Sequence, residues 1–164
     1  MNAAASPVIV GYDGSAAARE AITQAARLMG SCRFLVVTVW EEGLAYMAAP
    51  AIQINALETA PPTDPRLAAD LDRAQHADAE RVARQGADLA RSLGVAADPL
   101  TVPDTRNAAH TILDVARERE AAAIVVGSRG LTGLTARLEG STSKAVLKHA
   151  PCPVLVVHEQ GERD

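Results

Sequence analysis

Residues Ile124–Val157 read IVVGSRGLTGLTARLEGSTSKAVLKHAPCPVLVV, and the order of apolar runs and glycines in them indicates the fold. The run Ala121–Val126 is apolar throughout and predicts a buried strand. Four glycines follow it: Gly127, Gly130, Gly133 and Gly140. Ser141 then begins a predicted helix of about nine residues, and Pro153–Val157 predicts another apolar strand. This stretch therefore predicts a strand, a helix and a second strand that runs parallel to the first.

The rest of the chain continues this alternation of strands and helices. Further strands are predicted over Pro7–Tyr12, Arg33–Trp40 and, more weakly, Asp98–Val102. Helices are predicted from the Asp13–Ser15 turn to Gly30, over Arg66–Leu93, and over Ala108–Arg119 behind a cap at Asn107. Strands that are apolar without alternation are typical of a parallel sheet covered on both faces. We therefore expect one α/β domain over residues 1–164, with a doubly wound five-stranded parallel sheet.

One long segment, residues 43–65, fits neither pattern. It holds Pro50, Pro61, Pro62 and Pro65 and has no clean hydrophobic period. We expect an irregular excursion across the surface. Loops of this length are uncommon inside compact domains and are often functional.

Composition and charge exclude several classes of protein. Of the 164 residues, 48% are hydrophobic and 22% charged, which excludes wholesale disorder. The net charge is -4 with no basic stripe, so a nucleic-acid partner is not expected. The longest apolar run, Phe34–Trp40, is far shorter than the roughly 20 residues that span a bilayer, so no membrane partner is expected either. The absence of a secretory signal and the isolated Cys32 and Cys152 favour the cytoplasm.

The glycine-rich stretch after the fourth strand is a candidate phosphate site. It consists of Gly127-Ser128-Arg129-Gly130 and, further on, Gly140-Ser141-Thr142-Ser143. Glycines leave backbone N–H groups open to a bulky anion, and the start of a helix attracts negative charge. The hydroxyls of Ser141 and Ser143 add donors, while Arg129 and Arg137 either contact phosphate oxygens or remain solvated. The alternative is a tight turn without a ligand, which glycine spacing alone does not exclude.

The turn after the first strand, Gly11-Tyr12-Asp13-Gly14-Ser15, carries a negative charge instead. Because Asp13 would repel a phosphate, we expect it to accept hydrogen bonds from ribose hydroxyls or to lie near Mg²⁺; otherwise it is an ordinary turn carboxylate. Trp40 either stacks on a base or is half-buried packing, the more common role of such an aromatic. In open α/β sheets ligands bind beyond the carboxyl ends of the strands, where the strand order reverses.

Three common site motifs are absent from the sequence. There is no G-x-x-x-x-G-K-[ST] P-loop, no G-x-G-x-x-G after the first strand, and no G-x-S-x-G elbow. The four histidines fit no metal spacing, and Cys152 is interpreted as a small buried hydrophobe. No general base is evident near the expected phosphates, so we expect no catalytic residue.

The last predicted strand points to a partner. If Pro153–Val157 lies at the edge of the sheet, its unpaired N–H and C=O groups favour pairing with the same strand of a second copy. The alternative is that a helix or the tail covers this edge.

The residues quoted above resemble the universal stress proteins. The segment Ile124–Val157 is similar to the C-terminal signature of that family, and VIVGYDGS at Val8–Ser15 is similar to its first strand and turn. The glycine spacing beside CPVLVV is that of the ATP-binding branch, and the order of elements agrees along almost the whole chain. The turn Pro103–Asn107 departs from the glycine-containing turn often found there, and Gly43–Arg66 matches no family pattern.

This resemblance implies a fold like that of the adenine nucleotide alpha hydrolases and a homodimer through Pro153–Val157. It also implies ATP bound between the ends of the first and fourth strands. Asp13 would meet the ribose or Mg²⁺, and Val39 and Trp40 would lie near the adenine. The phosphates would meet Gly127, Ser128, Arg129, Gly130, Gly140, Ser141, Thr142 and Ser143.

The expected function is ATP binding in stress adaptation or signalling, with at most slow hydrolysis. Two alternatives stay open. One is a dimeric interaction module of the same family without nucleotide. The other is an enzyme that transfers phosphoryl or adenylyl groups.

Overall fold

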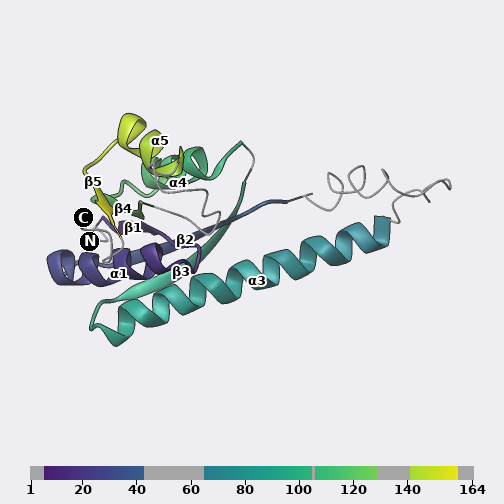
Figure 1. Ribbon diagram of the computed structural model, residues 1–164, viewed down its shortest axis with the longest axis horizontal. Coiled ribbons are helices and arrows are strands. Elements are labelled where there is room, and N and C mark those ends of the chain that lie inside the picture. The colour runs from purple at the N-terminus through teal and green to yellow at the C-terminus, as the bar shows by residue number, and fades with distance from the viewer. Residues whose placement is uncertain (1–5, 43–64, 105, 129–140, 159–164) are drawn as a thin grey trace, which may run out of the picture.

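A five-stranded parallel sheet forms the centre of the computed structural model, which describes residues 6–42, 65–104, 106–128 and 141–158 (Figure 1). The strands are β1 (Val8–Gly11), β2 (Phe34–Trp40), β3 (Ala97–Pro103), β4 (Ala123–Gly127) and β5 (Val154–Val157). The helices are α1 (Ala16–Met29), α3 (Pro65–Ser92), α4 (Ala108–Glu118) and α5 (Ser141–His149). The expected fold class is confirmed, and the predicted elements begin and end within two residues of the observed ones.

The strand order is β3-β2-β1-β4-β5, and every neighbouring pair is parallel. From β1 the chain moves outward through β2 to β3, then crosses to β4 on the other side of β1. The order therefore reverses between β1 and β4. Such a reversal leaves a crevice outside the carboxyl ends of the two strands, because the connections leave them in opposite directions.

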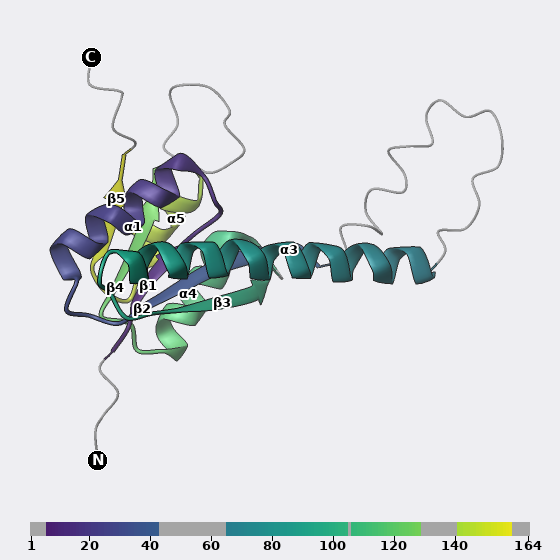
Figure 2. The same cartoon turned by 90° about the horizontal axis from the view of Figure 1, so that it is seen from below.

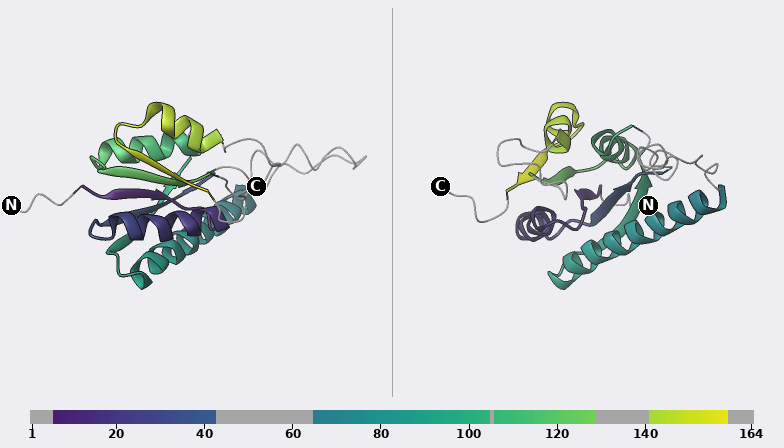
Figure 3. Two further views of the ribbon diagram at one scale, coloured as in Figure 1. Left: turned by 60° about the vertical axis from the view of Figure 1, so that its left-hand side comes forward. Right: turned by 45° about the vertical axis from the view of Figure 1, so that its right-hand side comes forward.

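The helices form two layers around the sheet. Figure 3 shows α1 and α3 on one face and α4 and α5 on the other. Successive β1 residues pack into opposite clusters: Val8 and Val10 lie with the alanines of α1 and α3, and Ile9 lies with α4 and α5. The three central strands β1, β2 and β4 are largely buried on both faces, and their sequences are apolar with little alternation, as expected.

Asn107 caps α4 as predicted, and of the two candidates Ser15 and Asp13, Ser15 caps α1. The Ser15 hydroxyl accepts the N–H of Ala18 at 3.1 Å, and the Asn107 side chain accepts the N–H of His110 at 3.0 Å. Pro99 lies inside β3, which proline tolerates because β3 is an edge strand with one side unpaired.

The longest helix, α3, has 28 residues and is about 42 Å long at 1.5 Å per residue. Its first turns extend beyond the sheet (Figure 2). Leu67 and Leu71 in those turns are 56% and 45% exposed, whereas Ala83, Ala87 and Ala90 nearer its end are buried. Pro65 begins the helix rather than ending an irregular excursion, and the rest of that excursion, 43–64, lies outside the described residues. Within the described part of the chain, no helix is long and apolar enough to cross a membrane.

Candidate functional site

Three strand ends that carry predicted site residues are neighbours in the sheet. Val39 and Trp40 end β2, Gly127 ends β4, and Asp13 follows β1, which lies between them. Adjacent strands are about 4.8 Å apart and parallel, so these ends share one edge of the sheet. The structure therefore brings the Asp13 turn, the end of β2 and the end of β4 to the predicted switch point.

The turn after β1 is built by its own side chains. The Asp13 carboxylate accepts the N–H of Ser15 at 2.9 Å, and Ser15 in turn caps α1. Gly14 has a φ of +80°, a left-handed conformation that favours glycine. The interpretation of Asp13 as a turn carboxylate is thus confirmed, and any role toward a ligand is additional to it.

Tyr12, the residue before Asp13, is held in place by Thr38 and Gly86, two residues to which the sequence pattern assigned no role in a site. Its carbonyl accepts a 2.8 Å hydrogen bond from the Thr38 hydroxyl, and its ring packs on α3 at Gly86. A Cβ on Gly86 would lie 2.8 Å from Cδ1 of that ring. Two signals were available: Thr38 is the lone hydroxyl in the strand FLVVTVW, and Gly86 is a glycine inside a helix.

At the end of β4, packing explains the first glycine of the candidate phosphate loop. A Cβ on Gly127 would lie 2.9 Å from the carbonyl carbon of Ala17 in α1. This glycine therefore lets α1 approach the sheet closely. The spacing of the glycines in the sequence did not indicate this packing role. Ser128 is buried, and its N–H donates to the carbonyl of Val157 at 2.8 Å, which extends the pairing of β4 with β5 by one residue.

The helix after the candidate loop begins at Ser141, as predicted. In its first turn Thr142 is half-buried and Ser143 is 2% exposed. Val146, further along, is fully buried among residues of β1, β4 and α4. Arg129, Gly130, Arg137 and Gly140 lie outside the described residues.

Trp40 packs against α3. Its ring centroid lies 5.1 Å from that of His76, at 50° between the planes. The interpretation of Trp40 as half-buried packing is confirmed, and His76, which the sequence placed in no site, lies beside it. Within the described part of the chain, the indole Nε1 of Trp40 is a buried polar atom without a hydrogen-bond partner.

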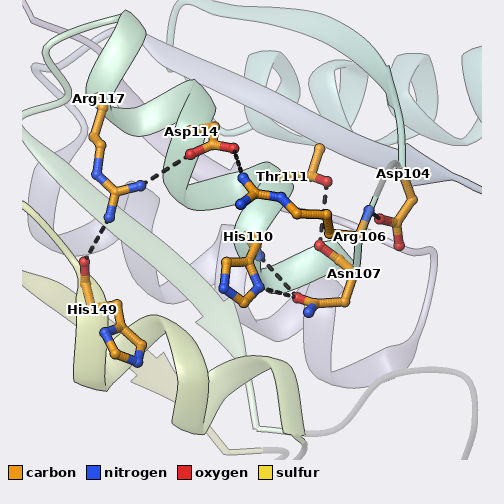
Figure 4. A network of polar contacts seen from close by, with 8 residues as sticks. All are labelled: Asp104, Arg106, Asn107, His110, Thr111, Asp114, Arg117 and His149. Atoms are coloured by element: carbon orange, nitrogen blue, oxygen red, sulfur yellow. Dashed lines mark hydrogen bonds and ion pairs between the residues drawn. The ribbon is translucent and has the colours of Figure 1, made fainter.

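Asp104 and Arg106, which follow β3 where the glycine of the resembling family is absent, are held by polar contacts (Figure 4). The N–H of Asp104 donates to the Trp40 carbonyl at 2.7 Å, and the Asp104 carboxylate accepts the N–H of Arg106 at 2.9 Å. Arg117 contacts Asp114 and also donates to the carbonyl of His149 at the end of α5. The first contacts connect the end of β2 to Arg106, which pairs with Asp114 of α4, and the last connects α4 to α5.

The described ranges hold no cluster of metal-ligating side chains. In residues 6–42, 65–104, 106–128 and 141–158, no group of three or more His, Cys, Asp and Glu could hold a metal ion. Cys152 is partly rather than fully buried, and this burial raises the pKa of its thiol, which disfavours the nucleophilic thiolate.

Comparison with known proteins gives one consistent family. The sequence profile of the Universal stress protein family matches residues 5–158. A universal stress protein of Thermus aquaticus is 31% identical over 152 residues, which are 92% of this chain and 96% of that protein. The solved structure of universal stress protein UspA from Lactobacillus plantarum is 26% identical, with a TM-score of 0.68, over 95% of this chain and 99% of that one.

Three other solved structures of this fold contain adenine nucleotides. A universal stress protein in complex with cAMP is 22% identical, with a TM-score of 0.62, over 96% of this chain and 100% of that one. One from Archaeoglobus fulgidus, in complex with dAMP, is 20% identical, with a TM-score of 0.61, over 94% and 98%. One from Arabidopsis thaliana with AMP bound is 18% identical, with a TM-score of 0.62, over 96% and 94%. At these identities the likeness establishes the fold.

Proposed function

Because the chain belongs to the universal stress protein family, we propose that it is a cytoplasmic ATP-binding member that acts in stress response or signalling. ATP lies across the carboxyl ends of β2, β1 and β4. Its adenine is near Val39 and Trp40, and its ribose is at Asp13. Its phosphates meet the loop from Gly127 to Ser143.

The observation that carries this proposal is the reversal of strand order between β1 and β4. At that point the Asp13 turn lies beside the end of β4, where the chain enters its glycine-rich stretch. Ligands of open parallel sheets bind at such reversals. Relatives with the same fold hold AMP, dAMP and cAMP, which agrees with an adenine nucleotide as the ligand class.

The chemistry of the residues fits a triphosphate better than a nucleoside alone. The loop offers backbone N–H groups at its glycines, and α5 begins at Ser141 with its N-terminus toward the loop that precedes it. Mg²⁺ commonly takes one or two carboxylates, with phosphate oxygens and water as its other ligands. Asp13 supplies one such carboxylate near this loop.

At the other end of the nucleotide, the side chain of Trp40 offers an apolar ring and a donor. Its buried Nε1 has no partner within the described residues, and such a buried donor costs roughly 1–3 kcal/mol when it is not satisfied. A ring nitrogen of adenine is an acceptor of the right kind. The ring edge of Trp40 therefore supports a base at the end of β2.

The direct test is nucleotide content and affinity. Protein purified without added nucleotide is extracted with acid and the extract is chromatographed, and the stripped protein is titrated with Mg·ATP by calorimetry. We expect adenine nucleotide in the extract and saturable binding that Gly130→Val or Gly140→Val abolishes, because a side chain would occupy the phosphate path. An empty extract with no titration heat favours the nucleotide-free interaction module, and sustained turnover with an acceptor favours the enzyme.

The homodimer through β5 is part of the proposal. This strand is at the edge of the sheet, and the carbonyls of Pro153 and Val157 face β4. Strand alternation turns the N–H and C=O groups of Val154 and Val156 to the opposite side, where a second copy can pair with them.

A single substitution tests this pairing. Val156→Pro removes an outward N–H without touching the bonds to β4, since proline is tolerated at edges. We expect light scattering after gel filtration to show a dimer for the native chain and a monomer for this variant. A native monomer, or a variant that remains a dimer, contradicts pairing through β5.

A further inference from the structure

The peptide group that joins Tyr12 to Asp13 is anchored by β2. Thr38 is 6% exposed, and its hydroxyl donates a 2.8 Å hydrogen bond to the Tyr12 carbonyl, which belongs to that peptide group. The Tyr12 N–H donates to the Val37 carbonyl at 2.9 Å. The strand pairing of β1 with β2 therefore ends in a side-chain bond at the residue before the turn.

The ring of Tyr12 is fixed from the other side by α3. Tyr12 is 5% exposed, and a Cβ on Gly86 would lie 2.8 Å from its Cδ1 and 2.9 Å from its Cγ. Val82, one turn earlier in α3, approaches the turn itself, since its Cγ1 would lie 3.7 Å from a Cβ on Gly14. Neither the ring nor the backbone of Tyr12 can rotate without moving α3 or breaking the bond to Thr38.

The direction of the Asp13 side chain depends on this anchor. The Tyr12 carbonyl lies in the same plane as the N–H of Asp13, so holding it restricts the ψ of Tyr12 and the φ of Asp13. The carboxylate is further tied to the N–H of Ser15 at 2.9 Å. A change at Thr38 would thus reach the carboxylate through a single peptide plane.

We infer that Thr38 is a positioning residue for Asp13, which it aims at the sugar hydroxyls of the bound nucleotide. This inference rests on the proposed ATP site and adds a residue that controls recognition of the sugar. Thr38 does not touch the ligand in this account. Its hydroxyl acts only through the peptide group between Tyr12 and Asp13.

The readout is the preference for ATP over 2′,3′-dideoxy-ATP, which lacks both sugar hydroxyls. Loss of folding stability weakens the binding of both ligands alike and leaves the ratio of their affinities unchanged. A misdirected Asp13 lowers the affinity for ATP more than the affinity for the dideoxy analogue, because only ATP has the sugar hydroxyls. The ratio therefore separates a positioning role from a merely structural one.

The experiment measures both affinities by calorimetry with Mg²⁺ for the native chain, Asp13→Ala, Thr38→Val and Thr38→Ser. We expect the native chain to prefer ATP by about tenfold, as one hydrogen bond to a charged group allows. In Asp13→Ala and in Thr38→Val, the affinities for the two ligands should differ by no more than about twofold, so most of the tenfold preference is lost. Thr38→Ser, which keeps the hydroxyl, should retain the native preference.

A second matched pair keeps the test valid if Thr38→Val does not fold. Thr38→Cys differs from Thr38→Ser by one atom and donates only weakly. Its preference should fall below that of the serine variant. A native preference in Thr38→Val or Thr38→Cys, with Asp13→Ala having lost it, overturns the inference.

Failure of this inference can be told from failure of the proposed function. A native chain that does not bind ATP contradicts the ATP site itself. If the native chain binds ATP and the dideoxy analogue equally, the ATP site stands, but the contact of Asp13 with the sugar is contradicted. That second result also overturns the role of Thr38.

Discussion

Gly127 at the end of β4 lies against the backbone of Ala17 in α1, and a Cβ atom on it would be 2.9 Å from the Ala17 carbonyl carbon. At Gly11, the last residue of β1, a Cβ would instead meet Cδ1 of Ile112 at 3.2 Å and Cγ1 of Val126 at 3.3 Å. Both of those atoms are the far ends of side chains. A side chain can turn aside, whereas a helix backbone must move as a whole.

We therefore expect Gly127→Ala to destabilise the fold more than Gly11→Ala. Overpacking against a rigid neighbour costs about 1–3 kcal/mol, and the change at Gly11 should cost less than that. Urea unfolding of both variants measures the two losses in the free energy of unfolding. An unchanged dependence of that free energy on urea concentration shows that the unfolded states are comparable. Equal losses would contradict the assignment of Gly127 to helix packing.

The contact between Gly127 and Ala17 also shows what the sequence predicts and where it stops. Apolar runs predicted the strands, and capping residues such as Ser15 and Asn107 predicted the helix starts, because both depend on neighbours along the chain. The reason for Gly127 depends on how closely α1 approaches β4. That distance follows from packing between distant segments, so glycine spacing alone suggested a phosphate site or a tight turn and not a packing role.

The same limit applies to the candidate site. The placement of Asp13 and Trp40 at the carboxyl ends of strands could be predicted, because one follows and the other ends an apolar run. Thr38, Gly86 and His76 could not be assigned, since their contacts join elements that are far apart in the sequence. Leu67 and Leu71 lie in the predicted helix Arg66–Leu93, but a helix prediction says nothing about burial, and the structure leaves both exposed because α3 extends beyond the sheet.

The two polar side chains that organise α4 should differ in their contribution to stability. Asn107 accepts the N–H of His110 and contacts its Nδ1 at 2.9 Å, whereas Asp114 bridges Arg106 and Arg117 on the exposed surface. We expect Asn107→Ala to cost about 1 kcal/mol and Asp114→Ala less than about 1 kcal/mol. Thermal and urea unfolding measure both, and a larger loss for Asp114→Ala would show that its two exposed ion pairs stabilise more than a helix cap does.

The Cys152 thiol should titrate at a higher pH in the folded chain than in the unfolded chain. Burial raises the pKa of this thiol in the folded chain, whereas a cysteine in an unfolded chain titrates at about pH 8.5. The folded state then holds the proton more tightly, so this contribution to stability is complete below the unfolded pKa and is lost as pH rises through the folded pKa. In a Cys32→Ser chain, the pH midpoint of iodoacetamide alkylation should be higher without urea than with it.

The effect of Cys152 on the pH dependence of folding stability is tested with its own control variant. Above the unfolded pKa, the free energy of unfolding of Cys32→Ser should fall with pH more steeply than that of a chain that also carries Cys152→Ser. Identical alkylation midpoints in the folded and unfolded chains would show that burial does not control this thiol.

Trp40 should report nucleotide binding by its own fluorescence. It is the single tryptophan of the chain, and its indole lies at the end of β2 with Nε1 buried and unpaired among the described residues. If adenine lies beside it, titration with Mg·ATP should change its emission to a plateau, with a midpoint equal to the calorimetric Kd. His76→Ala, which removes the neighbouring ring, should alter the starting emission and leave that response in place. Unchanged emission during a titration that calorimetry shows to be saturable, together with native affinity in Trp40→Phe, would place the adenine away from β2.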